Sequence, residues 1–134
     1  MKIGIRVTNP ATKEYNCIAW AAGDDKRFWW PLGGYWPPVV PRQVSLESFI
    51  KVFNNLGYEK CDNGDLESGY RKIVIYAQSD GIPTHAARQL DNGKWTSKLG
   101  KAEDVEHDGL VLPIISYGLP VLFLRRKKSL YLPS

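Results

Sequence analysis

The sequence has only two cysteines, Cys17 and Cys61, and only two histidines, His85 and His107, among its 134 residues. Their spacings do not match a structural zinc site, so we expect no metal and no cofactor. The two cysteines could pair in a secreted protein. We favour free thiols in a reducing cytosol, because residues 1–7 alternate like a strand and lack the pattern of a signal peptide.

The chain also lacks any apolar run close to the roughly 20 residues that span a bilayer. Its excess of basic residues is small, 18 Lys and Arg against 14 Asp and Glu, and the one basic cluster is Arg125-Arg126-Lys127-Lys128. Nucleic-acid binding needs a focused basic patch, so we expect neither a nucleic-acid nor a membrane partner and a cytoplasmic location. No repeat or low-complexity tract divides the chain, which predicts one domain over residues 1–134.

What the sequence does contain is a cysteine at the start of a short apolar helix. Asn16 is a good N-cap residue, and residues 18–22 continue helically until Gly23 stops them. A thiol at this end feels the positive end of the helix dipole, which favours the thiolate and makes Cys17 a candidate nucleophile. The alternative is that Cys17 is a small buried apolar residue.

An aromatic segment follows over residues 28–41. Its prolines and glycines exclude a regular helix and a central strand, while its aromatic residues make it too apolar for a solvated linker. We therefore expect an ordered loop packed over the body. Trp29, Trp30 and Trp36 in this loop would either wall a substrate groove or only cover one face of the Cys17 helix.

The rest of the chain predicts one more helix and several strands. Apolar residues at helical spacing after Ser45 predict a helix of about a dozen residues. Residues 72–77 are a β-branched apolar run typical of a central strand. Asp91-Asn92-Gly93 is a strong turn signal for a hairpin.

The last third of the chain is less regular. Residues 102–107 predict either one helical turn or an irregular crossing, and residues 110–115 and 120–124 predict strands or apolar tails. From the order of these elements we predict an α+β fold, in which N-terminal helices pack on one antiparallel β-sheet.

A base for Cys17 is available in His85, which lies at the predicted start of a hairpin strand. A cysteine nucleophile needs a base within hydrogen-bond reach, and that base needs a third group to orient it. A cysteine on a helix followed by a histidine on a strand is the chain order of the papain-like superfamily of cysteine hydrolases.

The hairpin itself carries a family resemblance. His-Ala-Ala-Arg-Gln-Leu-Asp-Asn-Gly-Lys-Trp, residues 85–95, resembles the transglutaminase-like hairpin, in which His-Ala starts a strand and a Gly-x-Trp turn returns. The order of Cys17 and His85 is also similar to that of NlpC/P60 peptidases and CHAP domains. Tyr-Asn-Cys-Ile-Ala-Trp-Ala, Trp-Trp-Pro and the hairpin further resemble an uncharacterised bacterial domain family, which implies no activity.

The papain-like resemblance implies a thiol-dependent hydrolase or acyl-transferase. Its substrate would be an amide in a peptide or protein: a peptide bond, an isopeptide bond or a glutamine side chain. Cys17 would attack the carbonyl carbon, and His85 would act as base and then as acid. Asn16 would either cap the helix or join the Cys17 N–H in an oxyanion hole.

The third member of the site is open. Transglutaminase-like domains place an Asp shortly after the Trp, but that place falls near residues 99–100 here, which are Leu and Gly. Asp104 is our first candidate, because a carboxylate both fixes the histidine tautomer and stabilises the imidazolium. Ser97 and Glu106 are the alternatives. A second hypothesis is a catalytically inactive papain-like binding domain that uses the aromatic loop 28–41.

Overall fold

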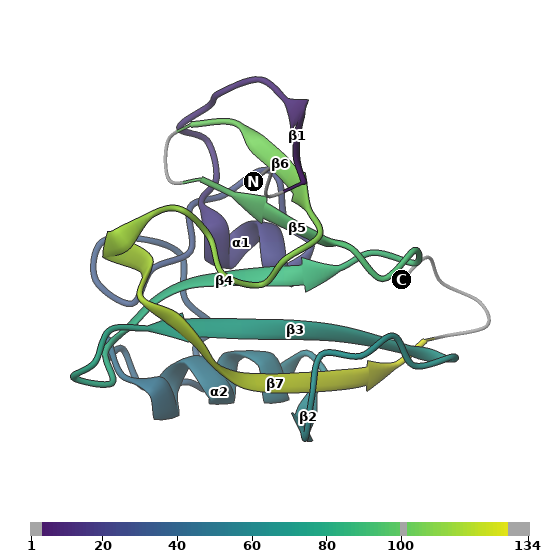
Figure 1. Ribbon diagram of the computed structural model, residues 1–134. Coiled ribbons are helices and arrows are strands. Elements are labelled where there is room, and N and C mark those ends of the chain that lie inside the picture. The colour runs from purple at the N-terminus through teal and green to yellow at the C-terminus, as the bar shows by residue number, and fades with distance from the viewer. Residues whose placement is uncertain (1–3, 100–101, 129–134) are drawn as a thin grey trace.

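The computed structural model describes residues 4–99 and 102–128. Its body is a seven-stranded antiparallel sheet with the strand order β1-β6-β5-β4-β3-β7-β2 (Figure 1). The strands are β1 Ile5–Asn9, β2 Glu59–Cys61, β3 Tyr70–Ala77, β4 Pro83–Gln89, β5 Trp95–Lys98, β6 Asp104–His107 and β7 Leu119–Lys127. The helices are α1 Cys17–Ala22, α2 Leu46–Asn55 and the 3₁₀ turn η1 Ile115–Tyr117.

The predicted α+β, papain-like fold class is wrong. The described residues form a β-rich fold, since α1 has only six residues and α2 has ten, whereas the sheet has seven strands. The main error concerns residues 104–107, which are β6 rather than a helical turn or an irregular crossing. Asp-Val-Glu-His does not alternate between apolar and polar residues, so the usual signature of a strand is missing.

The local signals for the two helices and for the hairpin are confirmed. Asn16 caps α1 by accepting a hydrogen bond from Ala19 N, and Gly23 ends it at a φ of 89°. Ser45 caps α2 through Ser48 N. The turn at residues 91–93 joins β4 to β5, which pair with antiparallel register.

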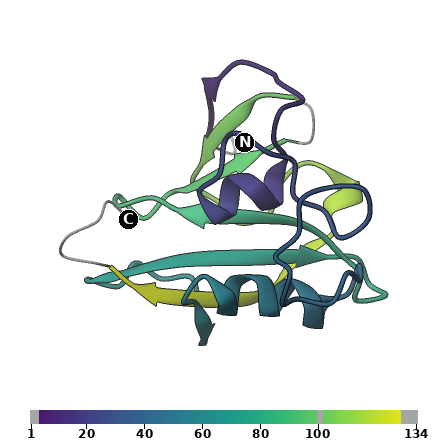
Figure 2. The ribbon, with the colours of Figure 1, turned by 180° about the vertical axis from the view of Figure 1, so that it is seen from behind.

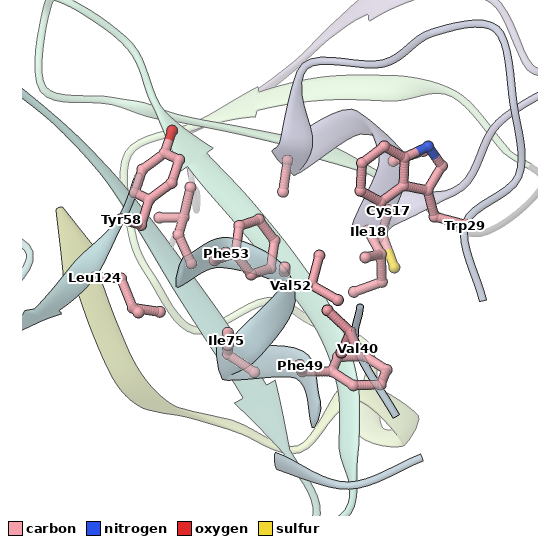
Figure 3. Close-up of a cluster of buried hydrophobic side chains, with 14 of the residues drawn as sticks. Cys17, Ile18, Trp29, Val40, Phe49, Val52, Phe53, Tyr58, Ile75 and Leu124 are labelled. Carbon is pink, nitrogen blue, oxygen red and sulfur yellow. The ribbon is translucent and has the colours of Figure 1, made fainter. Parts of the chain in front are cut away.

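Both helices cover the same face of the sheet, which we call the helix face (Figure 2). Because side chains alternate along a strand, this face receives Ile73 and Ile75 of β3, Ala86 of β4 and Leu124 of β7. They form one buried cluster with the apolar residues of the helices. Figure 3 labels part of this cluster: Cys17, Ile18, Trp29, Val40, Phe49, Val52, Phe53, Tyr58, Ile75 and Leu124.

The opposite face of the sheet carries a second, smaller cluster. Val74, Tyr76, Ala87 and Trp95 point to this side and pack with Leu112. Leu112 belongs to residues 108–118, which run across the sheet between β6 and β7 (Figure 1). We call this side the crossing face.

The aromatic loop 28–41 is an ordered loop packed over the body, as predicted. Trp36 is 1% exposed and Trp29 is 5% exposed. The ring of Trp36 lies 5.3 Å from that of Phe49 in α2, and the ring of Trp30 lies 5.5 Å from it. The tryptophans therefore belong to the core on the helix face.

None of the helices in the described part of the chain is both long enough and apolar enough to cross a membrane.

Candidate anion-binding site

The structure places Cys17 and His85 on opposite faces of the sheet. Cys17 lies on the helix face, where its thiol donates to the carbonyl oxygen of Thr84 at 3.9 Å. The side chain of His85 points to the crossing face, where its ring stacks on Tyr117 with 4.2 Å between centroids. The backbone of β4 separates them, so the two residues are not brought together as a nucleophile and its base.

The environment of Cys17 also disfavours the thiolate. Burial raises the pKa of the thiol to about 11, and the backbone N–H groups of Ala86 and Ile18 only partly oppose this effect. Cys17 is therefore a protonated thiol at neutral pH. The position of Cys17 at the start of α1 therefore serves the packing of the helix and does not activate the thiol.

His85 belongs to a buried polar chain on the crossing face. His107 Nδ1 lies 2.7 Å from the carbonyl oxygen of Gly109, which can only accept, so Nδ1 carries the proton. Ser97 then donates to His107 Nε2 at 2.7 Å and accepts from His85 Nε2 at 3.0 Å. This order leaves His85 Nδ1 as a buried acceptor without a partner among the described residues.

Both histidines in this chain are neutral at physiological pH. Burial, with a smaller contribution from His107, lowers the pKa of His85 to about 3. Burial also lowers the pKa of His107. Of the three candidates for the orienting group, Ser97 is thus the one that contacts His85.

Asp104 and Glu106 lie on the other face of the sheet from His85. Asp104 Oδ2 accepts from the hydroxyl of Tyr15 and from Asn9 Nδ2 at 2.9 Å. Glu106 Oε2 accepts from Arg6 at 3.1 Å. The carboxylates therefore join the N-terminal segment to β6, and neither orients a histidine.

The side-chain amide of Asn16 makes three hydrogen bonds within the local structure. Its Oδ1 accepts from Ala19 N at 3.2 Å and from Trp29 N at 3.0 Å, and its Nδ2 donates to the carbonyl oxygen of Trp29 at 2.7 Å. The amide therefore acts as a cap and as an anchor for the aromatic loop. Trp29 and Trp36 are buried in the core on the helix face.

The structure instead gathers three arginines at one pocket on the helix face. We call it the arginine pocket; its volume is about 310 Å³ and it is lined by Ala21, Ala22, Gly23, Tyr58, Arg71, Arg88 and Arg126. The arginines come from three neighbouring strands, since Arg71 is on β3, Arg88 on β4 and Arg126 on β7. Arg71 and Arg126 are directly opposite each other in the β3–β7 pair.

Packing holds the guanidinium groups in place at the pocket. The side chain of Arg71 is only 8% exposed. Arg126 donates to the carbonyl oxygen of Leu56 at 3.2 Å and lies 4.9 Å from the ring centroid of Tyr58. Arg88 lies 5.4 Å from the ring of Trp20.

Two of the arginines have an Nε–H donor that lacks a hydrogen-bond acceptor among the described residues. Arg71 Nε and Arg88 Nε are buried without a hydrogen-bond partner among the described residues. Such orphaned donors are rare in folded proteins and cost free energy.

The charge of the arginine pocket is also poorly balanced. No acidic side chain is among the residues that line it in the described part of the chain. The carboxylate facing Arg71 is Asp91, at 3.8 Å, and that carboxylate lies closer to Lys128, at 2.8 Å. Burial, together with the charges of Arg71 and Arg126, lowers the pKa of Arg88.

A second polar pocket differs from the arginine pocket because acidic residues line it. It lies near Cys61 and Lys72, and its volume is about 240 Å³. Its lining includes the acids Asp62 and Glu67, and Glu67 pairs with Lys72 at 3.4 Å and with Arg125. No group of three or more His, Cys, Asp or Glu in residues 4–99 and 102–128 is placed to hold a metal ion.

The fold and the pocket define a small β-rich domain with an arginine-lined site. The chain belongs to a domain family of unknown function, DUF7689, whose model matches residues 6–125. No curated protein and no solved structure gives a significant match to the chain.

Sequence reasoning named Arg126 only as part of the basic cluster 125–128 and assigned none of the three arginines to a site, although a signal for them exists. In each strand the arginine comes two residues after a buried residue of the helix face or two residues before one. Arg71 precedes Ile73, Arg88 follows Ala86, and Arg126 follows Leu124. A charged side chain that takes the next place in a row of alternating buried residues along a strand indicates a partly buried site.

Proposed function

We propose that this domain is a non-catalytic binding module that holds an anionic group in the arginine pocket. The observation that carries the proposal is a pocket lined by three arginines, with no acid among the described residues that line it. An oxyanion would accept from the guanidinium groups that line the pocket and would offset their charge, and Arg is the residue that best matches such ligands.

The thiol-dependent hydrolase inferred from the resemblance stays a prediction. The contacts of Cys17 and His85 favour the binding module over it, because these two side chains occupy opposite faces of the sheet. The burial of Trp29 and Trp36 in the core also favours the arginine pocket over the aromatic loop as the binding surface.

Anion binding can be tested by isothermal titration and by thermal unfolding. Wild-type protein would be titrated with inorganic phosphate and sulfate at constant ionic strength, with chloride as the comparison anion. We expect saturable binding and a rise in melting temperature with phosphate or sulfate, because a ligand of the folded state stabilises it.

The matched variants are Arg88→Gln and Lys13→Gln, each of which removes one positive charge. Lys13 is exposed and lies outside the pocket. Arg88→Gln is expected to lose at least tenfold in affinity, and Lys13→Gln is expected to bind like wild type. Equal weakening by both variants would show a diffuse charge effect and would contradict the proposal.

A further inference from the structure

We infer that the anion of the arginine pocket is the dianionic phosphoryl group of a small phosphate monoester. This inference rests on the proposed anion-binding function and narrows its ligand. Its basis is the number and placement of the guanidinium groups, the volume of the pocket and the open space beside Gly23.

The placement of the donors suits a ligand with more than two oxygens. A carboxylate has two oxygens and one charge, and one bidentate guanidinium satisfies it. Here the three guanidinium groups stand on three adjacent strands, and Arg71 and Arg126 are directly opposite across β3 and β7. A tetrahedral group with three free oxygens can accept from all of them, and its two charges leave less of the arginine charge unbalanced.

The pocket is larger than a bare phosphate ion requires. Its volume is about 310 Å³, at the lower end of the range for small-molecule sites. A water molecule takes about 30 Å³ in the liquid, so a phosphoryl group of five heavy atoms fills only a part of this space. The remainder can hold an organic group of a few atoms.

The end of α1 provides an opening for that organic group. Ala21, Ala22 and Gly23 line the pocket here, and all three are small. Gly23 is exposed, and a Cβ built on it would meet no atom within 4 Å. We therefore place the ester group beside Gly23, where it would leave the pocket.

One tyrosine and two carboxylates near the pocket have pKa values that are shifted away from the range between pH 5 and 7. Burial raises the pKa of Tyr58 above its ordinary value near 10. Hydrogen bonding to Lys128 lowers the pKa of Asp91, and Trp29, Lys26 and Arg27 lower that of Asp24 beside Gly23. A pH dependence of binding in this range therefore reports on the ligand.

The experiment is a set of calorimetric titrations of the full chain at constant ionic strength. The ligands are glycerol phosphate as monoester, dimethyl phosphate as diester, inorganic phosphate and acetate. We expect glycerol phosphate to bind at least tenfold more tightly than dimethyl phosphate or acetate. Its affinity should fall about tenfold from pH 7 to pH 5, because the second pKa of a phosphate monoester is about 6.

The substitution Ala22→Leu tests whether the pocket has space for the ester group, and it leaves all three arginines unchanged. The larger side chain should weaken glycerol phosphate more than inorganic phosphate, while circular dichroism and the melting temperature check the fold. Should this variant fold poorly, Arg126→Gln with wild type as reference separates the ligands by charge: the loss is expected to be larger for the dianion than for acetate.

The outcomes distinguish this inference from the function on which it rests. If acetate binds as tightly as glycerol phosphate and Arg88→Gln abolishes both, the phosphate inference is overturned while the anion pocket stands. A flat affinity between pH 5 and 7 overturns it as well. If no anion binds to wild type, the proposed function itself fails.

Discussion

The arginine pocket predicts that one of its arginines destabilises the free protein. Arg88 pairs with Ile73 across β3 and β4, so it stands diagonally to Arg71 on the same face. Side chains in this relation start about 7–8 Å apart at their Cα atoms. Two unit charges at that separation repel by about 0.5–2 kcal/mol for effective dielectric constants between water and a protein surface.

The substitution Arg88→Met removes this repulsion and keeps most of the apolar stem. It also removes the contact with the ring of Trp20, which lies 5.4 Å from the guanidinium carbon and is worth about 0.5–1 kcal/mol at such a site. Since the orphaned Nε donor disappears as well, we expect the free energy of unfolding to rise by about 1 kcal/mol in a buffer without oxyanions.

The assay is urea unfolding at low salt, with and without phosphate, for wild type, Arg88→Met and the surface control Lys13→Met. Without phosphate, Arg88→Met should have a higher free energy of unfolding than wild type. This difference should shrink as added salt screens the charges. Saturating phosphate should stabilise only wild type and the control. If Arg88→Met is less stable than wild type in both buffers, the repulsion argument is refuted.

Three further predictions concern the rest of the fold. Iodoacetamide should label Cys61 faster than Cys17 at pH 7, because Cys17 is buried and its pKa is raised to about 11. Cys61→Ser should remove the fast phase of labelling. Faster labelling of Cys17 than of Cys61 would instead support Cys17 as a nucleophile. Because the pKa of His85 is lowered to about 3, the unfolded chain takes up a proton that the folded one does not. Stability should thus fall as the pH drops from 6.5 toward 3, with a slope of up to about 1.4 kcal/mol per pH unit from this group. His85→Gln should show a smaller slope in urea unfolding at successive pH values, and an unchanged slope would contradict the assignment. Trp36→Ala should cost about 3–5 kcal/mol, against less than about 0.5 kcal/mol for the control Leu32→Ala at an exposed loop position; equal losses would show that Trp36 is not a core residue.

Local chemistry explains which elements could be predicted from the sequence. The cap at Asn16, the stop at Gly23 and the turn at residues 91–93 each act within a few residues, so their signals are contiguous. The helix after Ser45 is set by its cap and its apolar spacing in the same way. These predictions are confirmed because nothing distant has to be known.

β6 could not be predicted, because its pattern depends on its neighbours. Asp104, Glu106 and His107 would not normally occupy a buried strand, yet all three are buried. Each has a partner on another segment: Tyr15 and Asn9 for Asp104, Arg6 for Glu106, and Ser97 for His107. The apolar alternation is replaced by hydrogen bonds that only the assembled sheet provides.

The candidate site shows even more clearly what could not be predicted from the sequence. The sequence by itself determined that Cys17 begins a helix and that His85 lies on a strand, and both statements hold. It did not determine the face of the sheet to which each side chain points, because that depends on strand register and on where the helix packs. The tertiary structure alone placed Cys17 and His85 on opposite faces, and it alone brought Arg71, Arg88 and Arg126 from three separate strands to one pocket.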